Sequence, residues 1–137
     1  HLIKVAVEAA LGKREAVDVF GTDYATPDGT GVRDYIHVTD LVAAHLLALD
    51  HLRAGGASET FNCGYGAGFS VLEVINAVER VTGLTVPVER QARRPGDPPA
   101  VVADSGRLKS ALGWTPQYAA LDTIVDHAFR WEQSLPG

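Results

Sequence analysis

Two arginines lie in segments rich in glycine and proline. Such segments are not predicted to be helical, so these arginines do not serve to solvate the surface of a helix. Arg33 follows loop glycines and precedes Asp34. Arg94 stands in an extended stretch, with Asp97 shortly after it. Arginine carries five N–H donors in a planar fork, which suits bidentate recognition of a phosphate. Two such arginines could clamp a diphosphate, with Asp97 accepting from ribose hydroxyls. Alternatively, each pairs with its neighbouring carboxylate and fastens a loop, and residue types alone leave both interpretations open.

A glycine-rich turn follows Cys63, where Gly64, Gly66 and Gly68 precede a predicted helix. A dinucleotide-binding turn occupies the same place between a strand and a helix, but it needs its third glycine at the position of Phe69. We therefore interpret this turn as a tight connection between a strand and a helix.

Motifs for catalysis and for metal binding are missing from the sequence. It contains no nucleophile elbow, P-loop or paired-carboxylate motif. The five histidines lack the spacing of zinc ligands, and His37 is predicted to be a packed structural side chain. We expect no catalytic residue, no cofactor-binding residue and no metal ligand in this chain.

Length and composition indicate one globular domain over residues 1–137. The chain is 46% hydrophobic, and at this length it can bury roughly 65 to 70% of its unfolded surface. Its net charge of −5 has the wrong sign for a protein whose main partner is nucleic acid. No apolar run approaches the roughly 18 residues of a membrane span. The single cysteine suits a reducing compartment, so we expect a cytoplasmic protein.

The start of the sequence predicts a piece of a longer polypeptide. The chain has no methionine and begins at His1, in the flank of a predicted helix. An active site shared with a missing part would be incomplete here. The apolar faces of segments 2–11 and 42–52 would then lack a covering layer, so we expect the fragment to self-associate or to swap elements.

Periodicity and turn residues predict helices interleaved with short strands. The predicted helices cover 2–11, a segment from a cap at Thr39 or Asp40 to Leu52, 70–82, a segment from a cap at Asp104 to Gly113, and 122–134. The predicted strands cover 16–20, 33–38, 60–63, 84–90 at a sheet edge because of Pro87, and 101–103. This order predicts an α/β fold with a mixed small sheet flanked by helices.

Three stretches of the sequence together carry a specific resemblance: Phe20 to Tyr24, Thr26 to Val38, and Arg93 to Asp97. With them the chain resembles, over essentially its whole length, the C-terminal part of the UDP-glucose 4-epimerases, a family of extended short-chain dehydrogenases/reductases. The likeness includes residues 112–114 and the closing helix. It implies the substrate-binding part of that fold, without the N-terminal Rossmann half.

The resemblance implies an isomerase of galactose metabolism. Such an enzyme interconverts UDP-glucose and UDP-galactose by oxidation and re-reduction at C4 of the hexose, using NAD bound by the N-terminal half. That half also supplies the catalytic Ser, Tyr and Lys, so the fragment alone is expected to be inactive and its parent a homodimer. The alternatives are a related nucleotide-sugar dehydratase or decarboxylase, and a non-catalytic nucleotide-sugar-binding module.

The resemblance also implies roles for eight residues of this chain. The backbone at Asp18 and Phe20 would contact uracil, Arg33 and Arg94 would clamp the diphosphate, Asp97 would accept from the ribose, Tyr35 would line the same cleft, His1 would lie near the substrate, and Val101 would line the hexose pocket. Some relatives have asparagine in place of His1, and some epimerases have tyrosine in place of Val101. A valine there leaves room for an N-acetyl group on the hexose.

Overall fold

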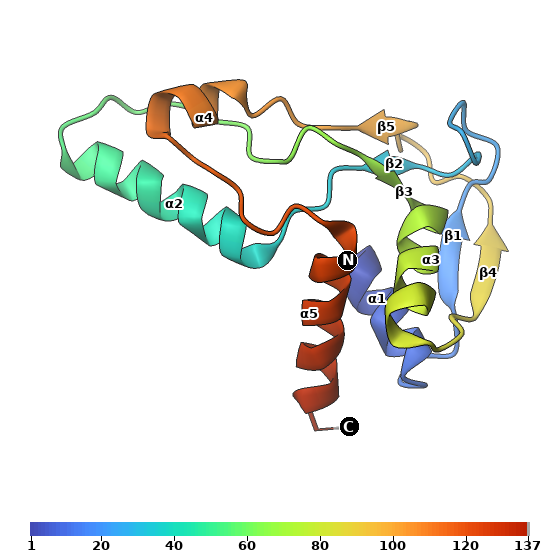
Figure 1. Ribbon diagram of the computed structural model, residues 1–137. Helices are drawn as coiled ribbons and strands as arrows, with labels where there is room; N and C mark the ends of the chain where they lie inside the picture. Colours follow the sequence, from blue (N-terminus) through green and yellow to red (C-terminus); the bar gives the residue numbers. More distant parts are fainter. Residues whose placement is uncertain (137) are drawn as a thin grey trace.

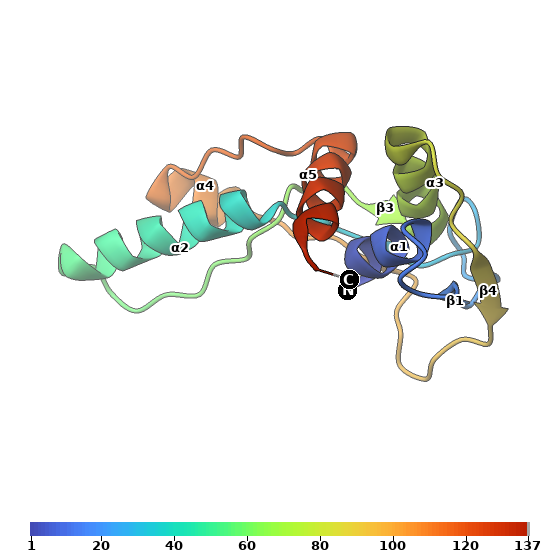
Figure 2. The ribbon, with the colours of Figure 1, turned by 90° about the horizontal axis from the view of Figure 1, so that it is seen from below.

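The computed structural model describes residues 1–136, and in it two groups of elements lie side by side (Figures 1 and 2). The helices are α1 (Leu2–Ala10), α2 (Val38–Arg53), α3 (Val71–Thr82), α4 (Gly106–Leu112) and α5 (Leu121–Ser134). The strands are β1 (Val17–Phe20), β2 (Val32–Arg33), β3 (Phe69–Ser70), β4 (Val88–Gln91) and β5 (Ala100–Val101). Helices α2 and α4 form one group, and α1, α3 and α5 gather near β1 and β4 in the other.

The predicted α/β fold with small mixed sheet structure flanked by helices is confirmed, but the strands divide between two sheets. Strand β1 pairs in parallel with β4, and β2 lies between β3, which is antiparallel to it, and β5, which is parallel. In β1, Val17 and Val19 are buried while Asp18 and Phe20 are exposed, as the alternation predicts. One face of β1 therefore belongs to the core and the other is free to bind.

The larger core lies between α1, α3, α5 and β1. Its buried members include Ile3, Ala6, Val7, Ala9, Val17, Val19, Val74, Val78, Ile124 and Val125. The expectation that segment 2–11 exposes an apolar face is wrong, because α3 and α5 cover that face within this chain. A smaller core joins α2 to α4 through Ala44, Leu108 and Trp114.

Several helix ends follow their local sequence. Ser70 caps α3 through its Oγ, which accepts from the Glu73 amide at 3.0 Å, and the Glu73 carboxylate accepts from the Ser70 amide at 2.7 Å. This reciprocal capping box satisfies two amides that a helix start leaves without partners. Gly83 ends α3 at φ 70° and Gly113 ends α4 at φ 68°, a left-handed conformation that favours glycine.

Other predicted boundaries are wrong, because tertiary contacts decide them. Segment 33–38 is a strand only at its first residue, and 60–63 is not a strand, since no described segment completes its backbone hydrogen bonds. Helix α2 is capped by His37, whose Nδ1 accepts from the Thr39 amide at 3.0 Å. Helix α4 has Ser105 at its N-cap position in place of the predicted Asp104.

A buried carboxylate joins the two groups of elements. Asp40, on α2, is 2% exposed and accepts from the Tyr65 hydroxyl at 2.6 Å and from the amides of Gln117 and Tyr118, both at 2.9 Å. Burial by itself raises the pKa of Asp40. The hydrogen bonds together lower it by more, so the pKa of Asp40 is below its ordinary value. The connection between α4 and α5 is thereby fixed to the start of α2.

A pair of histidines makes a second link between α2 and α5. Because His37 Nδ1 accepts from Thr39, its Nε2 carries the proton and donates to His127 Nδ1 at 2.9 Å. The ring of Tyr118 stacks on His37, with centroids 4.6 Å apart. Burial and the neighbouring His127 lower the pKa of His37, and the charge of Asp40 opposes them. The neutral imidazole is therefore the form that the fold stabilises.

We expect the protein to lose stability as the pH falls from about 7.5 to 5.5. The pKa of His37 is lower in the folded than in the unfolded state, so below about pH 6.5 the unfolded chain binds more protons and is favoured. Urea denaturation midpoints measured across this range check the slope. A His37→Asn variant, which keeps a capping side chain without titrating, should flatten it. An unchanged slope in that variant would contradict the assignment, and His45→Asn on the exposed side of α2 is the matched control.

Candidate functional site

A cavity of about 420 Å³ opens beside β1. Its lining residues come from α1, β1, the 21–35 segment, the start of α3 and the segment after β4: His1, Leu2, Val5, Arg14, Val17, Asp18, Phe20, Tyr24, Gly31, Arg33, Tyr35, Val71, Arg94 and Asp97. Seven of the eight residues that the resemblance selects are in this set. Val101 is the exception: it lies on β5, where it pairs with Arg33 in the ladder.

One edge of β1 is open beside the cavity. The amides of Val17 and Gly21 donate to Pro87 and Gln91 on the β4 side, at 2.8 and 2.9 Å. Alternate residues of a strand direct their backbone groups to opposite sides. The N–H and C=O of Asp18 and Phe20 therefore point away from β4. Since both residues also line the cavity, this edge can accept a planar ring with its own donors and acceptors.

Arg94 and Asp97 form the loop-fastening pair that the sequence left open. The Arg94 Nε donates to Asp97 Oδ2 at 2.9 Å, and the guanidinium lies 4.6 Å from the centroid of the Phe20 ring. Sixty per cent of the Arg94 side chain is nevertheless exposed. One carboxylate oxygen cannot engage all five donors of a guanidinium, so Arg94 can bind an anion while Asp97 holds it in place.

Arg33, unlike Arg94, does not pair with its neighbouring carboxylate. The alternative of an ion pair between Arg33 and Asp34 is therefore wrong. The Asp34 carboxylate accepts from the amides of Tyr65 and Gly66 at 3.0 and 2.9 Å. Arg33 donates to the Val32 carbonyl at 2.7 Å, and none of the ion pairs among residues 1–136 includes it. A cation on a cavity wall without a carboxylate partner is suited to an anionic ligand.

Tyr35 lies beside Arg33 on the same wall. Burial raises the pKa of Tyr35 to about 12, and the charge of Arg33 lowers it only in part. The hydroxyl therefore keeps its proton at neutral pH. Tyr35 can donate a hydrogen bond in the cavity, but it does not serve as a base.

Among the lining residues to which sequence reasoning assigned no role, two have polar side chains, Arg14 and Tyr24. Arg14 belongs to a charged connection between α1 and β1, and its position shortly before a strand with a free face was the signal that could have found it. Tyr24 is 7% exposed, and Arg93 covers its ring with the guanidinium 4.3 Å from the centroid. Only the folded loop brings these side chains to the cavity.

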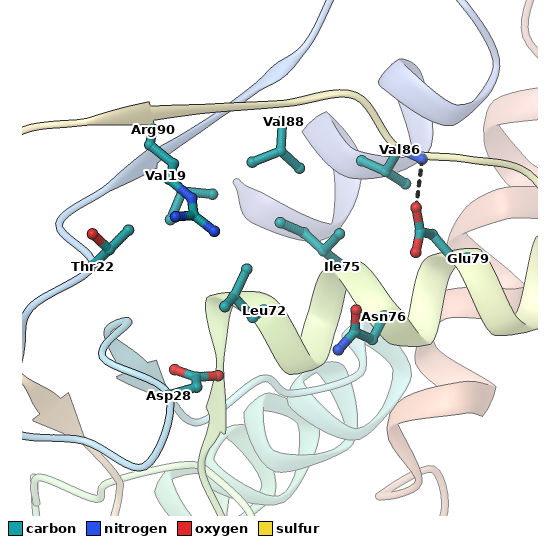
Figure 3. Close-up of a pocket in the computed structure, with 10 residues that line it drawn as sticks. All are labelled: Val19, Thr22, Asp28, Leu72, Ile75, Asn76, Glu79, Val86, Val88 and Arg90. Carbon is teal, nitrogen blue, oxygen red and sulfur yellow. Dashed lines mark hydrogen bonds between the residues drawn. The ribbon is translucent and has the colours of Figure 1, made fainter.

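A second groove, of about 470 Å³, lies between α3 and the pair of strands β1 and β4 (Figure 3). Val19, Val88 and Arg90 face α3 there, and Figure 3 shows Leu72 and Ile75 on the facing helix. None of the residues selected from the sequence lines this groove. The two sites share no lining residue, so this groove is separate from the candidate site.

Residues 1–136 contain neither a metal-binding cluster nor a membrane-spanning helix. No group of three or more His, Cys, Asp or Glu side chains there is placed to hold a metal ion. None of the described helices combines the length and the apolar character needed to cross a membrane.

Comparison with known proteins gives one consistent group. The family model described as GDP-mannose 4,6 dehydratase matches residues 1–127. A UDP-glucose 4-epimerase from Azospirillum brasilense is 57% identical over 135 residues, which are 98% of this chain and 39% of that protein. The chain thus spans about two fifths of the length of this relative.

Two solved structures match with the same coverage. The UDP-glucose 4-epimerase of Bifidobacterium longum, in complex with NAD⁺ and UDP, has a TM-score of 0.88 and 40% identity over 97% of this chain and 39% of its own. The UDP-Glc/GlcNAc 4-epimerase of Campylobacter jejuni has a TM-score of 0.87 and 48% identity over 98% of this chain and 40% of its own. The resemblance that the sequence motifs indicate is confirmed.

Proposed function

This chain belongs to the family of the GDP-mannose 4,6 dehydratase model, which covers residues 1–127, and from that membership we propose that it is the UDP-sugar-binding C-terminal part of a UDP-glucose 4-epimerase. The observation that carries the proposal is the convergence of His1, Asp18, Phe20, Arg33, Tyr35, Arg94 and Asp97 on one cavity. The 57% identity to a curated epimerase favours epimerisation over dehydration or decarboxylation.

The cavity offers a distinct place for each part of a uridine diphosphate. Uracil lies along the open edge of β1, where the backbone of Asp18 and Phe20 contacts it. The diphosphate lies between Arg33 and Arg94, and Asp97 accepts from the ribose. Tight contacts to the nucleotide hold the substrate while leaving the hexose free to turn over between oxidation and re-reduction at C4.

The glycine-rich turn after Cys63 does not fit NAD. In the turn after Cys63 the amides of Tyr65 and Gly66 already donate to the Asp34 carboxylate. A Cβ added at Gly64 would meet Ala103 Cβ at 2.6 Å, so the chain itself fills the space that a dinucleotide would need. We propose that NAD and the catalytic Ser, Tyr and Lys belong to an N-terminal half of the enzyme.

The test of this function is a product assay with the full-length enzyme and NAD. UDP-galactose is supplied, and the products are identified by proton NMR. The proposal requires UDP-glucose. A 4-keto-6-deoxy sugar formed with loss of water would identify a dehydratase, and binding of UDP-galactose without any product would leave a nucleotide-sugar-binding module.

We further propose that the parent enzyme is a homodimer that acts in galactose metabolism. We place it in the cytoplasm, because a single cysteine suits a reducing compartment.

The isolated chain is expected to self-associate through an apolar stripe on α2, where Val42, Leu46 and Leu49 are 49%, 57% and 42% exposed. Sedimentation velocity of the isolated chain measures its state of association. A Leu46→Glu variant should be more monomeric, and a wild-type chain that stays monomeric would contradict the expectation.

Val101 is predicted to set the breadth of the hexose pocket. It is 49% exposed, and a tyrosine there would occupy the space that an N-acetyl group needs. Overpacking costs about 1 to 3 kcal/mol, so Val101→Tyr should lower kcat/KM for UDP-N-acetylglucosamine by about 5- to 150-fold relative to UDP-glucose. The test is to measure kcat/KM for both substrates with the unaltered enzyme and with the Val101→Tyr variant. Equal loss of the two activities would mean that Val101 does not gate the pocket.

A further inference from the structure

Three arginines line the candidate cavity, and the diphosphate accounts for two of them. The third, Arg14, lies on the connection between α1 and β1. Its Nε is 3.5 Å from Glu8 Oε2, its side chain is 46% exposed, and the other Glu8 oxygen pairs with Lys4 at 2.9 Å. Within residues 1–136, Glu8 is its only ion-pair partner. The Glu8 contact engages Nε, so the terminal nitrogens of the guanidinium remain free to bind a ligand.

Arg14 and Arg94 lie at opposite ends of the open strand edge. Arg94 stacks on Phe20, the last residue of β1, whereas Arg14 precedes Val17, the first residue. At the usual rise per residue, these two ends of the strand are about 10 Å apart. A nucleotide whose diphosphate is held at the Arg94 end therefore directs its base along β1 toward Arg14.

We infer that Arg14 selects the base of the nucleotide, by donating to the carbonyl at C4 of uracil. This inference rests on the proposed function, because it takes the diphosphate to lie at Arg33 and Arg94. In a pyrimidine nucleotide, C4 lies across the ring from the nitrogen that carries the ribose. Uracil has an acceptor oxygen at C4, whereas cytosine has an amino donor there. A guanidinium only donates hydrogen bonds, so it attracts the uracil oxygen and repels the cytosine amino group.

The test compares UDP with CDP, which differ at this position of the base. Dissociation constants are measured by calorimetry for the full-length enzyme and for its Arg14→Leu, Arg14→Lys and Arg53→Leu variants. Arg53 is the matched control, since it is an exposed arginine on α2 that is 3.8 Å from Asp50 and does not line the cavity.

We expect Arg14→Leu to weaken UDP binding about 10- to 100-fold, because a charge-assisted hydrogen bond to uracil is lost. CDP binding should not be weakened, because the guanidinium makes no favourable contact with the cytosine amino group. Arg14→Lys should restore part of the preference for UDP, and Arg53→Leu should change neither constant. Equal weakening of UDP and CDP would overturn the inference and make Arg14 a general cation for the phosphates. Unchanged constants would also overturn it, leaving Arg14 as the partner of Glu8. If the unaltered enzyme bound neither nucleotide, the proposed function itself would fail.

Discussion

Replacing Arg33 or Arg94 by alanine in the full-length enzyme is expected to weaken UDP binding about 10- to 150-fold, since a hydrogen bond to a charged group contributes roughly 1.5 to 3 kcal/mol. Arg33 has no carboxylate partner among the described ion pairs and donates to the Val32 carbonyl, so its removal frees no carboxylate beside the ligand. Removal of Arg94, in contrast, frees Asp97, a carboxylate that would then repel the diphosphate. Calorimetric titration with UDP measures both effects.

Uridine provides the control for this prediction. It has the same base and ribose but no phosphate, so its affinity should hardly change in either variant. Arg90→Ala is the matched protein control, because Arg90 lines the separate groove beside α3. If UDP and uridine were weakened by the same factor, the two arginines would act only as structural supports of their loops.

The second large effect concerns catalysis, since the isolated 137-residue chain is expected to have no epimerase turnover. We propose that its cavity binds a nucleotide, but Tyr35, with its pKa raised to about 12, is no base at neutral pH. The glycine-rich turn after Cys63 does not fit NAD, because its amides already donate to Asp34. Without a hydride carrier and a proton-transferring group, bound UDP-galactose cannot be oxidised at C4.

The assay supplies the purified chain with UDP-galactose and NAD and follows the formation of UDP-glucose. The full-length enzyme at the same concentration is the positive control. Turnover by the chain above background would show that it contains a complete active site, and the division of roles between two halves would then be wrong.

Local sequence predicts those parts of the fold that local physics decides. The alternation in β1, the capping box at Ser70 and the glycine that ends α3 all depend on neighbours within a few residues. The strand predicted at 60–63 fails because a strand also needs a partner, which no described segment provides. His37, which the sequence did not select as the cap of α2, also contacts His127 and Tyr118, which lie far along the chain.

The candidate site was also only partly predictable from the sequence. The motif resemblance selected Arg33, Arg94 and Asp97, and the fold brings them into one cavity. Residue types alone could not choose between ion pairing and ligand binding for Arg33, because that choice depends on which groups the Asp34 carboxylate contacts. Asp34 is occupied by backbone amides of the turn after Cys63, which leaves Arg33 free. Arg14 was missed because its connection carries no motif and reaches the cavity only through the packing of α1 beside β1.

A crystal structure of the full-length enzyme with bound UDP is the most direct test of the account. It predicts phosphate oxygens at about 2.7 to 2.9 Å from the guanidinium nitrogens of both Arg33 and Arg94. It also predicts uracil hydrogen-bonded to the backbone of Asp18 and Phe20. A diphosphate bound elsewhere, with Arg33 and Arg94 contacting only protein atoms as they do now, would contradict the assignment of this cavity as the nucleotide site.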